Sequence, residues 1–420
     1  MQNDSNPRSE RYLARYFLNR VSSVDRCRDC GRVTVNTGGL VGVRAVDTAT
    51  AGITSGYAGL ASCGRIWLCP VCNSKVMARR AIDLGLMLLW AETNELHVIW
   101  GSLTNWHSEG DRLRGLLDLQ RDSWRRMTSA KVWRSAAEEK GGNRVGYVRP
   151  AELTVGRNGW HPHFHPIVLM KGSRSRAESL ASWMVDKWVE SVHKFGGRAQ
   201  ADGAQQLKVL APGTAGEWLS EYVTKSQYNR QASIYQADKL ALEAVWSQSK
   251  SGRGRVQSTQ AHWSLLDIAN RTGDVSMWWE LEEATAGHRM LTWSRDIRAK
   301  VGLGEESTDE EEAARELGSK DDTVCYITPA GWRKVRELPL VVAGILSELE
   351  QGGWLRLRDY LDRNGVDWVG PNEVQFSDDE GSNSTVTQLV ERLEPHNPRA
   401  GYHTTYIDPE LFSVLLKLDK

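Results

Sequence analysis

The chain has 420 residues, enough for two or three domains, and its 53 Lys and Arg balance 53 Asp and Glu, so the formal net charge is zero. A neutral total is unusual for a DNA-binding protein, but it conceals a basic stretch over residues 1–80 and an acidic one over 305–322. The apolar runs are too short to span a bilayer, and no cleavable signal sequence opens the chain. Five of the six cysteines precede residue 73, which does not fit a secreted disulfide framework, so we expect a cytoplasmic protein that binds no membrane.

The first 92 residues carry two Cys-x-x-Cys pairs, a spacing typical of tetrahedral zinc sites that hold structural Zn²⁺. The four cysteines are Cys27, Cys30, Cys69 and Cys72. Short β-like runs between the two pairs favour a zinc-ribbon-like module over residues 1–92. Cys63 lies near the second pair and could replace one of the four ligands. Unligated buried thiols or a redox-active pair are the alternatives.

From residue 73 to residue 210 the spacing of apolar residues predicts helices and strands. A helix with a basic first half is expected over 73–93. The elements that follow are a strand at 98–104, a helix at 111–127, strands at 145–155 and 160–170, a helix from Ser175 and a strand at 207–210. The order β-α-β-β-α-β is that of a ferredoxin-like antiparallel sheet with helices, so the predicted class is α+β.

Histidines occupy every second position at the start of the strand predicted over 160–170, which would form a hairpin with the strand at 145–155. They are His161, His163 and His165, and alternation in a strand places them on one face. Asn158-Gly159 is a strong signal for a type I′ turn, which would place Glu152 opposite His165. Imidazoles and a carboxylate that converge from two paired strands predict a small divalent-metal site. A solvent-facing His-rich strand is the alternative.

The sequence GWHPHFH at 159–165 resembles the HUH motif (His, hydrophobic, His) of plasmid rolling-circle replication initiators, in their Gram-positive and especially actinobacterial branch. SLTNWH at 102–107 and EYVTKS at 221–226 resemble the first motif strand and the tyrosine motif of that family. The resemblance implies an HUH endonuclease domain over residues 93–302. It also implies Mg²⁺ or Mn²⁺ as the catalytic ion, origin DNA as the partner, and a host helicase and polymerase that act afterwards.

The same resemblance makes Tyr222 the candidate nucleophile, which would nick one strand and leave a 5′-phosphotyrosine and a free 3′-OH. Lys225 would lie one helical turn away and stabilise the phenolate or the phosphate. Tyr228 is a candidate second nucleophile. Related initiators carry a glutamate one turn before the tyrosine to activate water in the closing step. Tryptophan stands at that position here, and Glu217 and Glu221 flank it as the candidates for this role.

Residues 303–324 are predicted to be an acidic linker, in which Thr308 and Glu311 fit a capping box. Residues 325–420 are predicted to form a small α-rich domain, and the sequence assigns no chemistry to it. Two other functions stay open at this point. One is an HUH transposase or relaxase, and the other is a non-catalytic zinc-ribbon DNA-binding protein with a degenerate nuclease fold.

Overall fold

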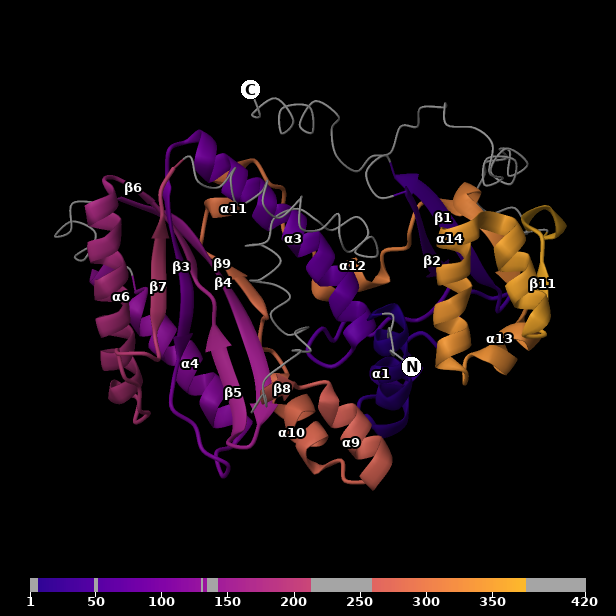
Figure 1. The fold of residues 1–420 in the computed structure, drawn as a ribbon, viewed down its shortest axis with the longest axis horizontal. Helices are drawn as coiled ribbons and strands as arrows, with labels where there is room; N and C mark the ends of the chain where they lie inside the picture. Colours follow the sequence, from indigo (N-terminus) through magenta and orange to yellow (C-terminus); the bar gives the residue numbers. More distant parts are fainter. Residues whose placement is uncertain (1–6, 49–51, 130, 134–142, 213–258, 375–420) are drawn as a thin grey trace, which may run out of the picture. The chain divides into compact units, whose positions relative to one another are not determined.

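The computed structural model describes residues 7–48, 52–129, 131–133, 143–212 and 259–374 (Figure 1). The chain divides into two compact units, each built from segments that are distant in the sequence. Unit 1 comprises Met1–Val33 and Ala61–Arg315, and unit 2 comprises Thr34–Leu60 and Glu316–Lys420. This division differs from the contiguous domains expected from the sequence, because strands near residue 50 pair with strands beyond residue 322.

Within the described residues, unit 1 is built on a seven-stranded antiparallel sheet. The strands are β3 (His97–Thr104), β4 (Asn143–Gly156), β5 (Gly159–Phe164), β6 (Ile167–Lys171), β7 (Gln206–Leu210), β8 (Thr259–Ala261) and β9 (Leu291–Trp293). β3 pairs with β5, β6 and β7, whereas the long β4 pairs with β5, β6, β8 and β9. The predicted α+β class and antiparallel sheet are confirmed.

The strand predicted over 160–170 is divided into β5 and β6 at His165 and Pro166. Pro166 has no backbone N–H to donate to a ladder, so the strand is interrupted there. The N–H of His165 still donates to the carbonyl of Pro150 over 2.9 Å. The break leaves β5 paired with the last part of β4 and β6 with its first part.

The hairpin of β4 and β5 has a register that differs from the prediction. Glu152 lies opposite His163, and Gly156 lies opposite Gly159. A type I′ turn needs positive φ at both central residues, but here Gly159 has a φ of 77° and Asn158 does not have a positive φ. The pairing is therefore shifted by two residues. Because side chains alternate with a period of two, this shift keeps Glu152 on the histidine face.

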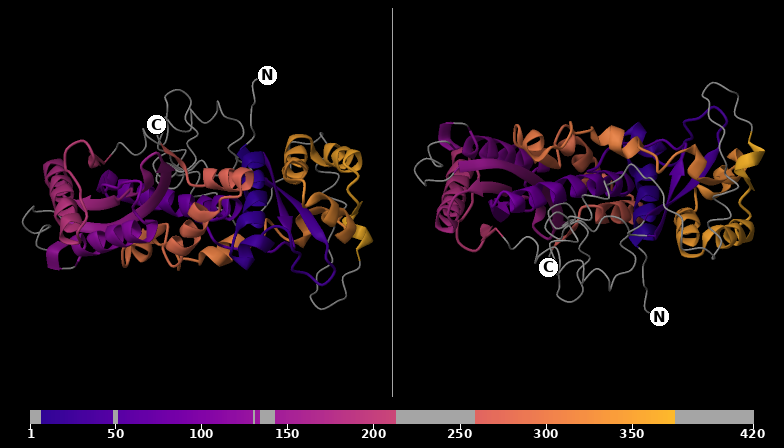
Figure 2. Two further views of the ribbon diagram at one scale, coloured as in Figure 1. Left: turned by 90° about the horizontal axis from the view of Figure 1, so that it is seen from below. Right: turned by 90° about the horizontal axis from the view of Figure 1, so that it is seen from above.

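Two helices, α4 and α6, cover one face of this sheet, which we call the helix face. The helices of unit 1 are α1 (Pro7–Val21), α2 (Asp25–Asp29), α3 (Pro70–Thr93), α4 (Leu113–Met127), α6 (Arg174–Lys194), α9 (Ser264–Thr272), α10 (Ser276–Thr285), α11 (Ile297–Val301) and α12 (Asp309–Ala314). α4 and α6 lie together on the helix face (Figure 1 and Figure 2). Trp124 of α4 and Trp188 of α6 pack edge-on against Phe164 of β5. The opposite face of β5 carries the histidines.

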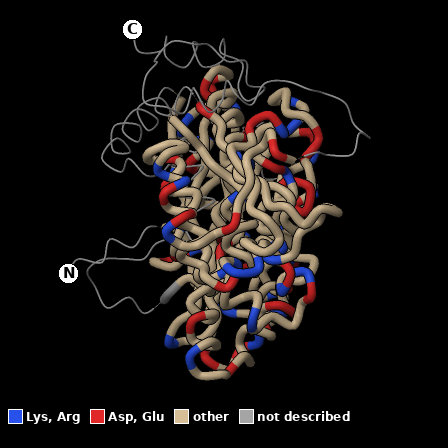
Figure 3. The backbone as a smooth tube through the Cα atoms, turned by 90° about the vertical axis from the view of Figure 1, so that its right-hand side faces the viewer, with Lys and Arg blue, Asp and Glu red and all other residues tan. Residues whose placement is uncertain are grey.

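The acidic segment after residue 304 contacts α3. The guanidinium of Arg80, 4 % exposed, lies 2.9 Å from Glu306 and 3.5 Å from Asp309. α12 begins with the predicted capping box of Thr308 and Glu311. Acidic and basic residues are interspersed along the described chain (Figure 3). Part of the segment that we expected to be a linker is therefore docked on α3 and neutralises one of its bases.

Unit 2 contains a four-stranded antiparallel sheet in the order β11-β10-β1-β2 within the described residues. Its elements are β1 (Val41–Thr48), β2 (Gly52–Ala58), β10 (Thr323–Ile327), α13 (Pro329–Val335), α14 (Pro339–Arg363) and β11 (Trp368–Val369), with single 3₁₀ turns at Lys320–Asp322 and Pro371–Glu373. The β-like runs that we assigned to a zinc ribbon thus belong largely to this sheet. The described part of the predicted α-rich domain contributes two strands as well as helices.

None of the helices in the described ranges combines the length and the apolar character that a membrane span requires.

Candidate functional site

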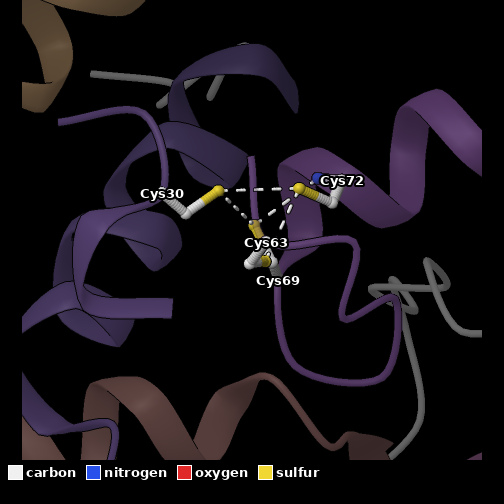
Figure 4. A group of neighbouring side chains, drawn as sticks. All are labelled: Cys30, Cys63, Cys69 and Cys72. Carbon is white, nitrogen blue, oxygen red and sulfur yellow. Dashed lines mark hydrogen bonds between the residues drawn. The ribbon is translucent and has the colours of Figure 1, made fainter. Parts of the chain in front are cut away.

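Four cysteines of unit 1 converge at the start of α3 (Figure 4). Cys30 is the C-cap residue of α2, and Cys63 lies in the loop that precedes α3. Cys69 is the N-cap residue of α3, and Cys72 lies in the first turn of that helix. All four are buried, and their sulfur atoms lie within 4.8 Å of one another. The Sγ of Cys30 is 3.7 Å from that of Cys69 and 3.5 Å from that of Cys72, and Cys63 is 3.6 Å from Cys72.

This spacing fits a structural zinc ion. A Zn–S bond of about 2.3 Å in tetrahedral geometry requires sulfur atoms about 3.8 Å apart. Hydrogen bonds from Cys30, Cys63 and Cys69 lower the pKa of Cys72 well below its usual value. Burial lowers the pKa of Arg15, but Tyr12 and the sulfurs of the cluster raise it, and the net shift is upward. A buried cation beside the cluster offsets part of the charge that four thiolates would carry.

The fourth member of this group is Cys63, whereas the sequence pattern indicated Cys27. Cys27 is fully buried and contacts Cys63, but it is not part of the group of four. The loop that carries Cys63 turns at Gly64, where φ is 63°. A Cβ at this glycine would come within 2.7 Å of the Glu310 backbone. A cysteine followed by a glycine, six residues before the Cys69 pair, is the sequence signal for this member of the group.

A second group of potential metal ligands lies on the face of the sheet opposite α4 and α6. The Nε2 atoms of His163 and His165 each lie 2.7 Å from Oε2 of Glu152. Glu152 is only 6 % exposed. Burial by itself would raise the pKa of Glu152, but hydrogen bonds from His163 and His165 lower it well below its usual value. A buried carboxylate and two imidazoles therefore meet at one point, as the sequence predicted for these three residues.

His161 lies beside this group but outside it. Its ring stacks on His107 with centroids 4.6 Å apart, and its Nε2 is 3.2 Å from the hydroxyl of Thr104. Burial, followed by the charges of His163 and His107, lowers the pKa of His161 to about 4. His161 is thus neutral at pH 7. The structure brings it into contact with His163 and does not place its nitrogens among the converging ligand atoms.

The segment after β3 carries an exposed aromatic side chain directly before His107, the residue whose ring stacks on His161. Trp106 is 56 % exposed, and the guanidinium of Arg198 lies 5.7 Å from the centroid of its ring. The N–H of Trp106 donates to the carbonyl of Arg198 over 2.7 Å, which fixes the backbone of this segment. The sequence analysis included this tryptophan in SLTNWH but gave it no role. Its position directly before His107 is the signal that it lies near the site.

The residues assigned to the tyrosine motif lie outside the described residues, in the interval 213–258. They are Glu217, Glu221, Tyr222, Lys225 and Tyr228. Their placement relative to Glu152, His163 and His165 stays a prediction from the sequence.

Comparisons with known proteins place the histidine hairpin inside a matched region. A family model described as "Replication protein" matches residues 59–193. The chain is 28 % identical to the protein named "Protein rep" of Streptomyces lividans, with 68 % of this chain and 75 % of that protein covered. It is 26 % identical to the "Neomycin resistance protein" of Streptomyces cyanogenus, with 57 % of this chain and 63 % of that protein covered. No solved structure matches the chain significantly.

Proposed function

Since the chain belongs to the replication protein family, we propose that it initiates rolling-circle replication of a plasmid by nicking one DNA strand at the origin. The observation that carries this proposal is the convergence of Glu152, His163 and His165 on the face of an antiparallel sheet opposite α4 and α6. A family match alone would fit a protein that only binds the origin. Two imidazoles and a buried carboxylate at one point add the means for phosphoryl-transfer chemistry.

The ligand atoms of the histidine site fit a divalent cation. Glu152, His163 and His165 each offer one atom, and these atoms lie within 4.8 Å of one another. Carboxylate oxygens suit Mg²⁺ and Mn²⁺, and imidazole nitrogens extend the range to softer ions. When bound, such a cation would polarise the scissile phosphodiester and offset its negative charge. Glu152 remains ionised at neutral pH because its pKa is lowered, so it is ready to bind a cation without losing a proton.

The proposed covalent step uses Tyr222. Its phenolic oxygen forms a bond to the phosphorus while the bond from phosphorus to the 3′ oxygen breaks. The phenol loses its proton, the departing oxygen gains one, and the products are a 5′-phosphotyrosine and a free 3′-OH. Lys225, three positions after Tyr222 in the sequence, would stabilise the phenolate or the phosphate. In a later transesterification a 3′-OH attacks the phosphotyrosine, which releases Tyr222 and joins the DNA strand.

Two neighbouring groups support single-stranded DNA near the cation site. The exposed indole of Trp106 offers a surface on which an unpaired base can stack, and Arg198 adds a positive charge beside it. His161 packs on the ring of His163 and, being neutral, adds no repulsion to a bound cation. We propose that His161 positions His163 for cation binding and does not itself bind the ion.

Cleavage of single-stranded oligonucleotides that tile both strands of the replicon, measured with Mn²⁺, tests this function. His163→Ala and His165→Ala should each lose cleavage, because two remaining ligands hold the cation poorly, while duplex origin binding stays close to wild type. His193→Ala is the matched control, since His193 is an exposed histidine of α6 whose ring nitrogen hydrogen-bonds the backbone of Ala199. Cleavage at the wild-type rate in both site variants would contradict the proposed role of the histidines.

The family match favours the initiator over an HUH transposase or relaxase, because the matching model describes replication proteins. A non-catalytic DNA-binding protein would give no cleavage of any tiled oligonucleotide in the wild type. That outcome would remove the catalytic proposal while leaving the family assignment intact.

A further inference from the structure

A pocket of about 360 Å³ opens on the helix face of the sheet in unit 1. Its lining includes Arg114 and Arg121 of α4, Arg149 of β4, Thr292 of β9 and the loop residues His288 and Arg289. Four of the eight lining residues are arginines, and none is acidic. The pocket is therefore a concave surface dominated by guanidinium groups, and it has the size of a small ligand site.

This pocket is separate from the histidine site. Arg149 and Glu152 are three residues apart in β4, so their side chains point to opposite faces of the sheet. The guanidinium of Arg149 lies 4.1 Å from the centroid of the Phe164 ring. Phe164 sits between His163 and His165 in the sequence and points away from both. A phosphate in the pocket is thus distinct from the scissile phosphodiester that a cation at Glu152, His163 and His165 would polarise.

Arg149 is a buried cation at the bottom of the pocket. It is 9 % exposed, and one of its nitrogens, Nη2, donates to the hydroxyl of Thr292 over 3.1 Å. Its Nε has no hydrogen-bond partner, and no carboxylate among the described residues pairs with it. Burial lowers its pKa to about 10, so it remains charged at neutral pH. A buried charge is costly unless it is paired, and an anion from outside the chain would pair it.

The other charges around the pocket leave a positive excess. Arg121 pairs with Asp118 at 2.6 Å and with Asp122 at 3.0 Å. The four arginines, less these two aspartates, leave an excess of two positive charges. Burial is the main cause that lowers the pKa of His288, so this residue adds little charge at neutral pH. An excess of two positive charges in a pocket of this size suits a compact anion with several oxygens.

We propose that this pocket binds a phosphate group. Planar guanidinium groups bind phosphate oxygens through paired N–H donors, and several arginines around one pocket are typical of phosphate recognition. The phosphate can come from the backbone of a DNA strand that runs past α4 and the loop between α10 and β9, or from a free nucleotide. The site goes beyond the proposed nicking reaction and does not depend on it, because it lies on the other face of the sheet.

The test measures the binding of a short, labelled single strand of mixed sequence to the full chain over a series of salt concentrations. The variants are Arg149→Gln and Arg289→Ala, and Arg125→Ala is the control, since Arg125 is an exposed arginine of α4 that does not line the pocket. Arg289 is exposed, so its variant tests the pocket even if Arg149→Gln fails to fold. A lost phosphate contact lowers the slope of log K against log salt by about 0.7 for single strands. A second arm follows thermal stabilisation of each protein by inorganic phosphate and by dATP.

A smaller slope for the pocket variants, with the control unchanged, assigns the site to the DNA backbone. Unchanged DNA slopes, combined with stabilisation by phosphate and dATP that Arg289→Ala loses, assign it to a free phosphate or nucleotide. If neither slope nor stabilisation differs from wild type in Arg289→Ala, or if Arg125→Ala lowers the slope as much, the proposal is wrong. Neither arm measures cleavage, so a failure here is distinguishable from a failure of the nicking mechanism.

Discussion

Replacing Cys63 by serine tests which four cysteines would bind zinc: the group that converges in the structure, or the four of the two Cys-x-x-Cys pairs. In the structure Cys63 is one of the four converging sulfurs, and Cys27 is a fully buried neighbour of that group. The matched pair is therefore Cys63→Ser and Cys27→Ser. Both exchange one buried sulfur for an oxygen, so they differ mainly in whether a zinc ligand is lost.

The size of the effect follows from the four-sulfur geometry. The sulfur–sulfur distances of 3.5, 3.6 and 3.7 Å lie close to the roughly 3.8 Å that tetrahedral Zn–S bonding requires, so binding needs little rearrangement. Structural zinc binds small domains with about 10–16 kcal/mol, and an equal share per ligand is about 3–4 kcal/mol. Cys63→Ser should then weaken zinc binding by roughly 10² to 10³ fold. Cys27→Ser should keep zinc and lose about 1–3 kcal/mol of folding stability, because it buries an unpaired hydroxyl.

Zinc content by elemental analysis and zinc affinity by competition with a chromophoric chelator measure this difference. We expect about one equivalent of zinc in the wild type and in Cys27→Ser, and much less in Cys63→Ser. Full zinc content in Cys63→Ser together with loss in Cys27→Ser would contradict the reasoning and restore the ligand set of the two sequence pairs. If the wild-type protein, purified without chelators, contains no zinc, the hypothesis of a zinc site is wrong.

Two further predictions concern the histidine face. The lowered pKa of Glu152 means that its ionised form stabilises the folded state above the usual value of about 4.3, and that this stabilisation is lost as pH falls below it. The melting temperature of the metal-free protein should therefore fall more steeply between pH 5 and pH 3 in the wild type than in Glu152→Gln. An equal fall in both proteins would contradict the claim that the ionised Glu152 stabilises the fold. Trp106→Ala should weaken single-strand binding by about 1–3 kcal/mol in a fluorescence titration, because a stacked base is lost. The exposed Trp279 of α10, in Trp279→Ala, is the control, and equal weakening by both would show that stacking at Trp106 is not specific.

The sequence was sufficient for the histidine face because strand alternation is a strict geometric rule. The alternation rule placed Glu152, His163 and His165 on one face even though the predicted register of the β4–β5 hairpin was wrong by two residues. The turn could not be predicted in detail, because Asn158-Gly159 is compatible with more than one turn and only Gly159 adopts positive φ.

Features built from distant segments were out of reach of sequence patterns. Cys63 joins the cluster only because the loop turns at Gly64. The sheet of unit 2 pairs β1 with β10, which lie about 280 positions apart in the sequence. Arg149 shares its pocket with residues of a helix and a loop that no local motif connects to β4.

The most direct test of the proposed mechanism is to identify the residue that becomes attached to DNA. The wild-type protein is incubated with the tiled single-stranded oligonucleotides and Mn²⁺, resolved on a denaturing gel and mapped by mass spectrometry. The third tyrosine of the interval 213–258 is Tyr235, which the family resemblance gives no role. We expect one covalent adduct, at Tyr222, which is absent in Tyr222→Phe and present in Tyr228→Phe and Tyr235→Phe. Tyr222→Phe should stay folded and bind duplex origin DNA, because it loses one oxygen and keeps its ring. An adduct mapped to another tyrosine, or a Tyr222→Phe protein that still becomes attached, would contradict the mechanism.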